Sequence, residues 1–512
     1  MKFLKKIKAI HIIIIIFFFI NLIFLTEFPF VHSDEAWLSG LSRNILHNKD
    51  LSVTEPFFDL FPRHPHAIKV FFHSIHIFFI KLLRYNIFTF RFISLIAGTA
   101  GLYLFFLIAK KFTDNKILAI LTTIIIALDI QYTYASHFAR QEIILLLIFF
   151  IAFYYLQYKY CYGGSISQDL IMGLILGAAI GIHPNSFVIA LPFILIYTYN
   201  LFITKKIKLA NYLTFGVTLG VIALFFIMLS LKLDPNFINN YASYGERLGV
   251  FSSIFTKIDR LDYFYKKIFY RVSGTYYIPP IKFQLVLFAL GLISAIFKLF
   301  FKKDKKNITL LLSFLAINIG YIVIGRYNQT GIIFIFPICY LLLLNILSSI
   351  KKKYSFIIIS LIIVVLAFNT TTTLIRDSHN NYDQYLSEIS RVVDKDDQVL
   401  ANLNSEYYFN NGSLFDYRNL AYLNENNISF SEYIASTNIE YIIYPEEMDF
   451  IYNTRPVWNM LYGNPYPYYQ DMKKFLDNKC KLVHSFTNQT YGMRIVRYIG
   501  KKDWNIKIYK VK

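Results

Sequence analysis

Eleven apolar runs divide this chain of 512 residues, and they constrain its fold more than any other feature. A helix needs roughly 20 apolar residues to cross the hydrocarbon core of a bilayer. The chain is 56% hydrophobic and only 16% charged, which leaves too little polar surface for a water-facing globule. The sequence therefore predicts a polytopic α-helical membrane protein with about eleven transmembrane helices. The runs that reach or approach the required length lie near 9–29, 88–109, 117–134, 142–158, 169–183, 186–203, 210–231, 283–301, 308–326, 330–350 and 354–373.

Lysine-rich segments separate many of these runs, and their positions predict an orientation. Cytoplasmic loops of membrane proteins carry an excess of lysine and arginine. The same rule accounts for the net charge of +20 better than nucleic-acid binding does, so no nucleic-acid partner is expected. The first run is about 20 residues long and lacks an A-x-A cleavage site, which favours an uncleaved first helix over a signal peptide. With a cytoplasmic N-terminus, the lysines that fall inside are Lys2, Lys5, Lys6, Lys8, Lys110, Lys111, Lys116, Lys159, Lys205, Lys206, Lys208, the cluster from Lys302 to Lys306, and Lys351 to Lys353.

This orientation makes three long segments extracytoplasmic: 30–87, 232–282 and the tail from 374 to 512. The tail is polar, and four short β-like runs alternate with helical patterns over 381–394 and 468–477. We therefore expect a transmembrane domain over 1–373 and an extracytoplasmic α/β domain over 374–512. The predicted strands are 399–401, 441–444, 480–483 and 506–509.

Two adjacent carboxylates, Asp34 and Glu35, follow the first apolar run directly. One explanation is helix capping, with Ser33 or Asp34 as the N-cap and a carboxylate at the positive end of the helix. The other is a general base at the membrane surface, where both a lipid-linked donor and an aqueous acceptor can reach it. The residues alone leave both explanations open.

The segment after the acidic pair combines an amphipathic stretch with basic and imidazole groups. Residues 67–83 have the pattern of a helix that lies in the interface plane. Arg63, His64 and Lys69 could hold a phosphate at the headgroup level, or they could attract anionic lipid headgroups. The histidines also raise the alternative of structural zinc, although they form no firm tetrahedral ligand set. These histidines are His64, His66, His73 and His76.

Several short motifs occur in order along residues 1–350. In this combination the chain resembles the GT-C superfamily of membrane glycosyltransferases, and within it the branch of protein mannosyltransferases and aminoarabinose transferases. The end of the glycine-studded run, His183-Pro184, departs from the lysine-containing form of many relatives. The motifs are Asp34-Glu35, His64-Pro65, Arg91-Phe92-Ile93-Ser94, Ala139-Arg140-Gln141-Glu142, the glycine-studded run from Gly173 to Pro184, and Gly325-Arg326-Tyr327 followed by Pro337.

The resemblance implies an inverting transfer of a sugar from a polyprenyl-phosphate carrier to an envelope protein, lipid or glycan. The reaction would take place on the extracytoplasmic face of the plasma (inner) membrane. Asp34 would be the general base, and Glu35 would position the acceptor or share that role. The departing phosphate needs electrostatic stabilisation, and the candidate cations are Arg63, His64, Lys69, Arg91, Arg140 and Arg326. The candidates for a second acidic member of the site are Asp129 and Glu142.

Plainer alternatives exist for several of these residues. Arg140 and Arg326 lie near span ends and could extend to lipid headgroups. Glu142 could pair with Arg140, and Asp129 could serve only as a helix-end residue of the third run. The tyrosines between 241 and 277 could stack on sugars, or they could form the aromatic belt at the membrane surface.

Two other classes of protein share the predicted architecture. A cell-envelope polysaccharide polymerase or ligase would favour arginines in late outer loops over an early acidic pair. A transporter would place charged or broken helices near the bilayer midplane, whereas most ionisable residues here lie near span ends. The sequence predicts no cofactor with certainty, and it leaves open whether a divalent metal ion takes part. The expected partners are the lipid-linked donor, the acceptor and membrane lipids.

Overall fold

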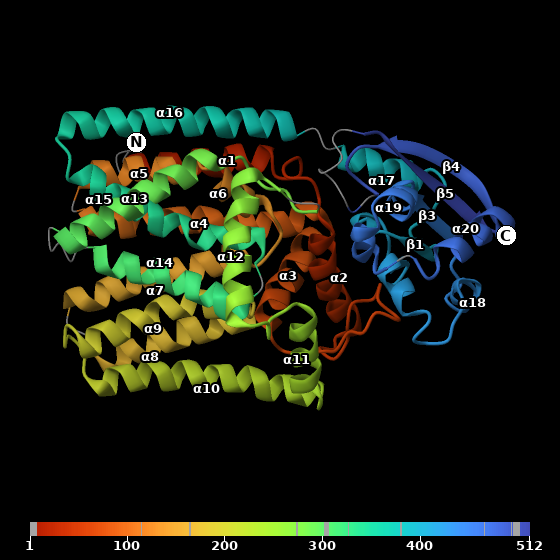
Figure 1. Ribbon diagram of the computed structural model, residues 1–512, viewed down its shortest axis with the longest axis horizontal. Coiled ribbons are helices and arrows are strands. Elements are labelled where there is room, and N and C mark those ends of the chain that lie inside the picture. The colour runs from red at the N-terminus through yellow and green to blue at the C-terminus, as the bar shows by residue number, and fades with distance from the viewer. Residues whose placement is uncertain are drawn as a thin grey trace.

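The computed structural model has a helical bundle at one end and a small α/β domain at the other (Figure 1). The structure describes residues 8–113, 115–162, 165–272, 275–301, 307–325, 327–378, 381–464, 466–492, 494 and 502–512.

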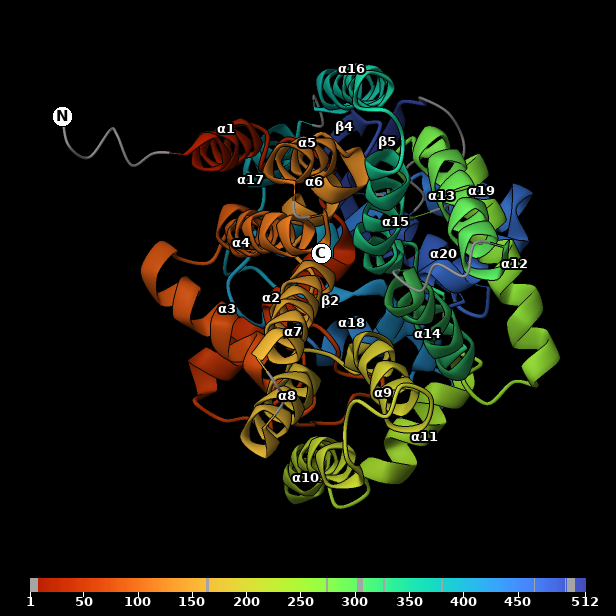
Figure 2. The ribbon, with the colours of Figure 1, turned by 90° about the vertical axis from the view of Figure 1, so that its left-hand side faces the viewer.

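Six helical segments of the described chain are long and apolar enough to cross a membrane. Viewed end-on, they lie roughly side by side, with α15 inside the bundle and α10 and α16 at its edges (Figure 2). The apolar window ending in α15 is 94% buried within the protein, whereas that of α10 is 17% buried. The exposed apolar faces of the outer helices suit a lipid environment, and the chain is a multi-pass membrane protein. The six are α4 (Ile87–Thr113), α7 (Glu142–Tyr162), α10 (Leu209–Leu233), α13 (Lys282–Phe301), α15 (Phe336–Ser348) preceded by η4 (Gln329–Phe334), and α16 (Lys352–Asp377).

The other predicted runs also form helices, but these are shorter or broken. The expected span at 117–134 is a pair of helices bent by 62°. Asp129 causes the break because its carboxylate accepts hydrogen bonds from the backbone of Gln131 and Tyr132 and starts a new helix. The broken pair is α5 (Lys116–Ala127) and α6 (Ile130–His137), and the shorter apolar helices of the bundle are α1 (Ala9–Ile23), α8 (Ile166–Ala178), α9 (Ser186–Phe202) and α14 (Ile308–Ile324).

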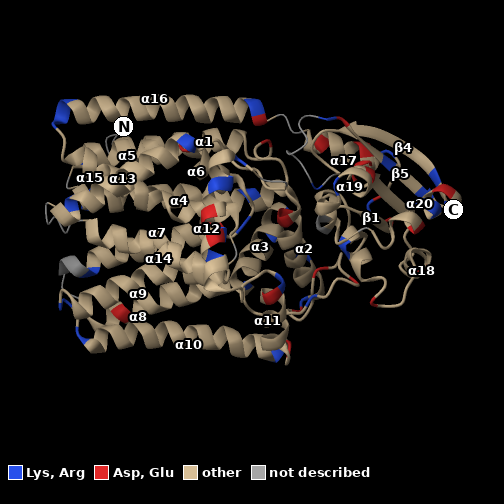
Figure 3. Ribbon diagram, in the orientation of Figure 1, with Lys and Arg blue, Asp and Glu red and all other residues tan. Residues whose placement is uncertain are grey.

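Lysine and arginine lie at the ends of several bundle helices that point away from the α/β domain, and others lie at the opposite end, for example at the end of α16 nearer that domain (Figure 3). This distribution agrees with the lysine pattern of the sequence. Lys159, which the sequence assigns to the same side, lies in the last turn of a helix and not in a loop. It belongs to α7, its side chain is fully buried, and it pairs with Asp169 of α8.

Four further helices lie at the end of the bundle that faces the α/β domain. Of these, α12 runs across the direction of the spans (Figure 1). The amphipathic stretch predicted at 67–83 forms α3. The four helices are α2 (Ser33–Asn48), α3 (Val70–Leu83), α11 (Phe237–Arg247) and α12 (Ile254–Tyr270).

The α/β domain contains a five-stranded sheet in the order β2-β1-β3-β5-β4. The four strands predicted in the tail are confirmed as β1, β3, β4 and β5, whereas β2 was not predicted. Strand β1 pairs in parallel with β2 and β3, and β5 pairs antiparallel with β3 and β4. The strands are β1 (Val399–Ala401), β2 (Leu414–Asp416), β3 (Tyr441–Pro445), β4 (Cys480–Asn488) and β5 (Trp504–Val511), and the α-helices are α17 (Tyr382–Ser390), α18 (Phe430–Ser436), α19 (Glu447–Thr454) and α20 (Tyr469–Lys479).

Candidate active site

The acidic pair lies in the first turn of α2, and its two carboxylates point to different surroundings. His32 is the N-cap of this helix, and its Nδ1 accepts a hydrogen bond of 3.0 Å from the backbone N–H of Asp34. Burial lowers the pKa of His32 to about 4, although the Asp34 carboxylate opposes the shift, so the ring is neutral near pH 7 and can accept this bond. Glu35 completes a capping box by accepting from the backbone N–H of His32 at 2.8 Å.

Glu35 forms a closed ion pair with Arg91 of α4. Two parallel hydrogen bonds of 2.9 and 3.0 Å join the guanidinium to the carboxylate, and the backbone N–H of Ala139 donates a third at 3.0 Å. Arg91 also donates to the carbonyls of Leu25 and Pro29. Both side chains are 0% exposed. The structure therefore places these two candidates inside the protein, where they tie α2 to α4 and to the segment before α7.

Asp34 has a different environment, at the junction between the bundle and the α/β domain. Its Oδ2 accepts a hydrogen bond of 2.7 Å from Arg140 Nη1 and another from the Tyr276 hydroxyl. Arg140 Nη2 lies 3.2 Å from Glu142 Oε1. We call Asp34, Arg140, Glu142 and Tyr276 the junction network. Of the three charged side chains in this network, that of Asp34 is 26% exposed, compared with 9% for Arg140 and 4% for Glu142. Asp34 is therefore the carboxylate in this network that a ligand can best reach.

Residues from α6, from the segment that links it to α7 and from the start of α7 carry buried polar atoms without hydrogen-bond partners among the described residues. Glu142 Oε1 accepts from the Thr330 hydroxyl at 2.6 Å, but its Oε2 has no partner. A buried polar atom left in this state costs about 1–3 kcal/mol. Several such atoms together are typical of a site that a ligand or ordered water completes. The set comprises Arg140 Nε, Glu142 Oε2, Gln141 Oε1, Tyr134 OH and His137 Nε2.

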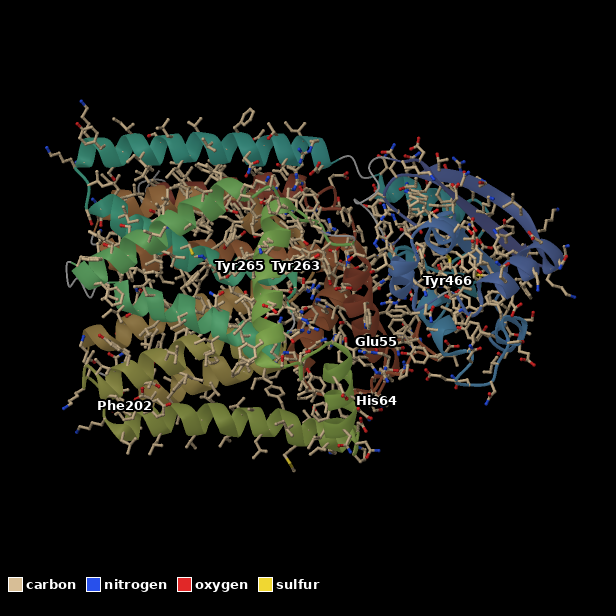
Figure 4. All side chains as sticks on the ribbon, in the orientation of Figure 1. Glu55, His64, Phe202, Tyr263, Tyr265 and Tyr466 are labelled. Carbon is tan, nitrogen blue, oxygen red and sulfur yellow. The ribbon has the colours of Figure 1, made fainter. Side chains whose placement is uncertain are left out.

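The first long loop brings Arg63 and His64 to a small pocket of about 20 Å³, which has room for about one water molecule. Figure 4 shows Glu55 and His64 near the α/β domain, at the end of the bundle. Arg63 forms two hydrogen bonds of 2.8 Å with the buried Glu55. Burial alone would raise the pKa of Glu55, but Arg63 outweighs it and lowers that pKa to about 2. Lys69 is the N-cap of α3, with φ of 97°. The guanidinium carbon of Arg63 also lies 5.1 Å from the ring centroid of Trp37 on α2.

Asp129, another candidate from the sequence, lies elsewhere. The carboxylate of Asp129 is fully buried in the bundle, where it caps α6 and accepts a hydrogen bond from Tyr340. It begins a helix, whereas the sequence analysis placed it at the end of one near the outer face. Arg326 lies outside the described residues.

Sequence reasoning did not single out Thr330 or Gln141, and it treated Tyr276 only as one member of an aromatic-rich segment. Tyr276 accepts from Arg140 at 2.7 Å and stacks on His32, with ring centroids 4.3 Å apart. Its signal in the sequence is weak because it lies 242 residues from Asp34. Only the folded chain shows that this tyrosine belongs to the junction network.

The junction network does not fit a resident metal ion. The guanidinium of Arg140 lies between Asp34 and Glu142 and contacts both carboxylates. Within the part of the chain that the structure describes, no three His, Cys, Asp or Glu side chains are grouped to hold a metal ion. His73 and His76 share the hydroxyl of Ser42, at 2.8 and 3.1 Å.

Comparison with solved structures gives similar folds at low sequence identity. ArnT from Cupriavidus metallidurans bound to undecaprenyl phosphate matches with a TM-score of 0.55 and 12% identity, over 85% of this chain and 95% of that one. The apo oligosaccharyltransferase of Archaeoglobus fulgidus matches with a TM-score of 0.58 and 13% identity, over 88% and 71%. The archaeal oligosaccharyltransferase AglB from the same organism, with an inhibitory peptide and a dolichol-phosphate, gives 0.51 and 12%, over 87% and 71%.

No protein-family model matches the sequence. No curated protein matches it either. The similarity is therefore one of fold, and both kinds of neighbour are GT-C glycosyltransferases. The resemblance suggested by the short motifs is confirmed at the level of architecture: this chain has the GT-C fold.

Proposed function

We propose that this protein is a glycosyltransferase that moves a sugar from a polyprenyl-phosphate donor to an envelope protein, lipid or glycan. The GT-C fold supports this class of reaction, although fold alone does not determine function. Among the solved neighbours, one holds undecaprenyl phosphate and another holds a dolichol-phosphate with an inhibitory peptide. Among the residues that the structure describes, the one sheet belongs to the α/β domain, so the described connections between bundle helices contain no α/β fold.

The observation that carries the proposal is the position of Asp34. It is a partly exposed carboxylate next to a buried guanidinium that retains an unpartnered Nε among the described contacts. A base and an anion-binding cation therefore lie side by side where the bundle meets the α/β domain. Acceptor activation needs the first group, and phosphate departure needs the second.

In the proposed reaction Asp34 removes the proton from the acceptor hydroxyl. The acceptor oxygen attacks the anomeric carbon, the bond from that carbon to the phosphate oxygen breaks, and the polyprenyl phosphate leaves with the electron pair. In-line attack inverts the anomeric configuration. Arg140 stabilises the phosphate through its Nε, while Glu142 and Tyr276 hold the guanidinium in place.

Glu35 and Arg91 take a different role in this mechanism. Both are buried and already joined by two hydrogen bonds. We assign them to positioning, because together they fix the first turn of α2 and with it the direction of Asp34. Arg63, His64 and Lys69 remain candidates for contacts to the donor headgroup or to lipid.

An apolar pocket of about 370 Å³ offers space for part of the polyprenyl chain. It lies among α12, α13, α14 and α15, and Tyr265, which Figure 4 labels on α12, is at its edge. Phe288, Leu292 and Phe336 supply apolar walls. Isoprenoid units bury well against such side chains.

The proposed topology follows the lysine distribution. The N-terminus and the lysine-rich ends of the bundle face the cytoplasm, and the α/β domain at 374–512 is extracytoplasmic. Eleven spans result when the bent pair counts as one and the four shorter bundle helices also cross. In a bacterium the protein would occupy the plasma (inner) membrane.

Replacement of the base tests the proposal directly. Asp34→Asn should lower the release of polyprenyl phosphate by about 10²–10⁴-fold, because amide oxygen is a poor base. Purified protein would be incubated with a panel of polyprenyl-phosphate sugars and acceptor extracts, with lipid phosphate as the readout. Asp50→Asn is the matched control: Asp50 is an exposed carboxylate of the same outer segment that accepts from Ser52. Wild-type release by a folded Asp34→Asn variant would refute the proposed base.

A further inference from the structure

Two arginines of the α/β domain face the same end of α2 as the junction network. Arg418 belongs to η6 (Tyr417–Tyr422), and its guanidinium carbon lies 4.5 Å from the ring centroid of Trp37 and 4.8 Å from that of Phe58. Trp37 follows Asp34 by three residues, so the two side chains occupy neighbouring positions on one face of α2. The α/β domain therefore places a cation beside the proposed base.

Direct contacts hold this domain against the segment that leads to Asp34. The Tyr491 hydroxyl accepts a hydrogen bond of 3.2 Å from the backbone N–H of Val31, and Asn404 Nδ2 donates to the Val31 carbonyl at 3.3 Å. Arg494, the second arginine, follows Tyr491 by three residues. Its own backbone N–H donates to Glu447 at 2.8 Å, which fixes its position within the domain.

The two guanidinium groups share one carboxylate, Asp416. Arg418 Nε donates to Asp416 Oδ1 at 2.6 Å, but Arg494 Nη1 lies 3.9 Å from Oδ2, which is too far for a hydrogen bond. Burial lowers the pKa of Arg494, and the nearby Arg418 lowers it further, whereas Asp416 and Asp34 oppose the shift. The pair therefore carries one more positive charge than its shared partner can neutralise.

Each arginine also has an unused donor. Arg418 Nη2 and Arg494 Nη1 are buried without a hydrogen-bond partner among the described residues, and the side chain of Arg418 is 9% exposed. Asp416 Oδ2 is likewise without a hydrogen bond. Buried donors without partners destabilise a protein unless a ligand or water satisfies them. Guanidinium groups bind phosphate oxygens especially well because their planar donors match the geometry.

From this geometry we propose that Arg418 and Arg494 form a phosphate-binding site in the α/β domain, separate from the reacting phosphate at Arg140. The proposal rests on the proposed glycosyltransferase function and narrows its substrates. A phosphate in this position has two chemical sources: the second phosphate of a polyprenyl-diphosphate donor, or a phosphate group on the acceptor. In either case, one of the two substrates carries an additional anionic group close to the sugar that is transferred.

Binding measurements with Arg494→Gln test the site without requiring turnover. The full-length protein in neutral detergent would be titrated with four probes: a polyprenyl monophosphate, the matching diphosphate, a phosphorylated glycolipid and its dephosphorylated form. We expect the variant to bind the diphosphate or the phosphorylated glycolipid about tenfold more weakly, because one donor pair is lost. Affinity for the monophosphate and for the dephosphorylated glycolipid should stay the same.

Control variants distinguish a loss of phosphate binding from misfolding and from failure of the proposed transfer reaction. Arg494→Lys keeps the charge and should retain part of the selectivity, which provides a second variant if Arg494→Gln does not fold. Arg391→Gln, which removes an exposed arginine paired with Glu388 on α17, should change no affinity. Asp34→Asn should bind the probes with wild-type preference even if transfer is lost, so failure of the base and failure of this site can be distinguished.

The probe that loses affinity identifies the source of the phosphate. A loss confined to the diphosphate assigns the site to the donor, and a loss confined to the phosphorylated glycolipid assigns it to the acceptor. Equal affinities of wild-type protein and folded Arg494→Gln and Arg494→Lys variants for all four probes would overturn the proposal.

Discussion

Two ion-pair networks of the described chain differ in how many of their polar atoms have hydrogen-bond partners. The first is the junction network around Asp34. The second, which we call the lysine network, comprises Lys159, Asp169, Tyr197 and Asn211. In the lysine network Asp169 accepts from Lys159 and Tyr197 on Oδ1 and from Asn211 on Oδ2. Its two charged side chains are 0% exposed, and none of its four members contributes an unpartnered buried atom among the described contacts.

Both networks combine a cation, a carboxylate and a tyrosine hydroxyl, so composition does not distinguish them. They differ in whether every buried polar atom has a hydrogen-bond partner and in whether a ligand can reach the carboxylate. The lysine network joins α7, α8, α9 and α10 and leaves nothing for a ligand to satisfy. The junction network keeps Asp34 partly exposed, with unpartnered atoms on Arg140 and Glu142 beside it. A satisfied buried network serves the architecture, whereas an incomplete one at a domain junction is typical of a binding or catalytic site.

The largest effect on stability should come from Lys159→Met. The substitution leaves the carboxylate of Asp169 buried without its cation, which costs about 3–5 kcal/mol in the free energy of unfolding. Turnover per folded molecule should not change, because Lys159 lies in the lysine network and not in the site. Thermal unfolding in detergent and release of lipid phosphate measure the two quantities.

Two further variants sharpen this expectation. Replacing both partners in Lys159→Met/Asp169→Leu should recover much of the stability, since the unpaired charge is removed as well. Lys111→Met is the matched control, because Lys111 is partly exposed at the end of α4 and its ammonium lies over the rings of Tyr154 and Tyr158. A large loss of turnover in folded Lys159→Met would contradict the division between the two networks.

In the junction network we expect the opposite result: a substitution should lower turnover and leave stability nearly unchanged. Arg140→Lys keeps a positive charge beside Asp34 and Glu142, so the protein should remain folded. The compact ammonium of lysine cannot reproduce the planar fork by which Arg140 reaches two carboxylates while its Nε stays available to phosphate. We expect turnover to fall about 10²-fold, which corresponds to about 2.7 kcal/mol of transition-state stabilisation. Arg376→Lys, at the exposed end of α16 next to Asp377, is the control and should behave as wild type.

The sequence predicted the helices well because hydropathy is a local property of the chain. All eleven apolar runs correspond to helical segments, and the error at 117–134 reflects a single capping residue, Asp129. The tail strands were also found from local patterns. Strand β2 was missed because its three residues, Leu414–Asp416, end in an aspartate, whereas the equally short β1 is apolar throughout.

The candidate site was predictable only in part, because its geometry depends on contacts between distant segments. The motif analysis selected both Asp34 and Arg140, yet nothing in the sequence indicates that they meet across 106 residues. It treated Asp34 and Glu35 as one acidic pair, whereas the fold gives Glu35 to a closed ion pair with Arg91. Arg418 and Arg494 carry no local motif, since their proximity to α2 arises from the docking of the α/β domain.

The smallest predicted effect is on turnover, and it should distinguish the hydroxyl of Tyr276 in the junction network from that of Tyr197 in the lysine network. Tyr276→Phe removes the hydrogen bonds to Asp34 and Arg140 but keeps the ring that stacks on His32. We expect about a tenfold loss of turnover, because a hydrogen bond to a charged group is worth about 1.5–3 kcal/mol. Tyr197→Phe removes the equivalent hydroxyl from Asp169, where the bond is 2.7 Å long, and should lower only the unfolding temperature. If both variants lost turnover equally, the hydroxyls would be supporting a common scaffold, and the distinction between an open and a closed network would have no functional meaning.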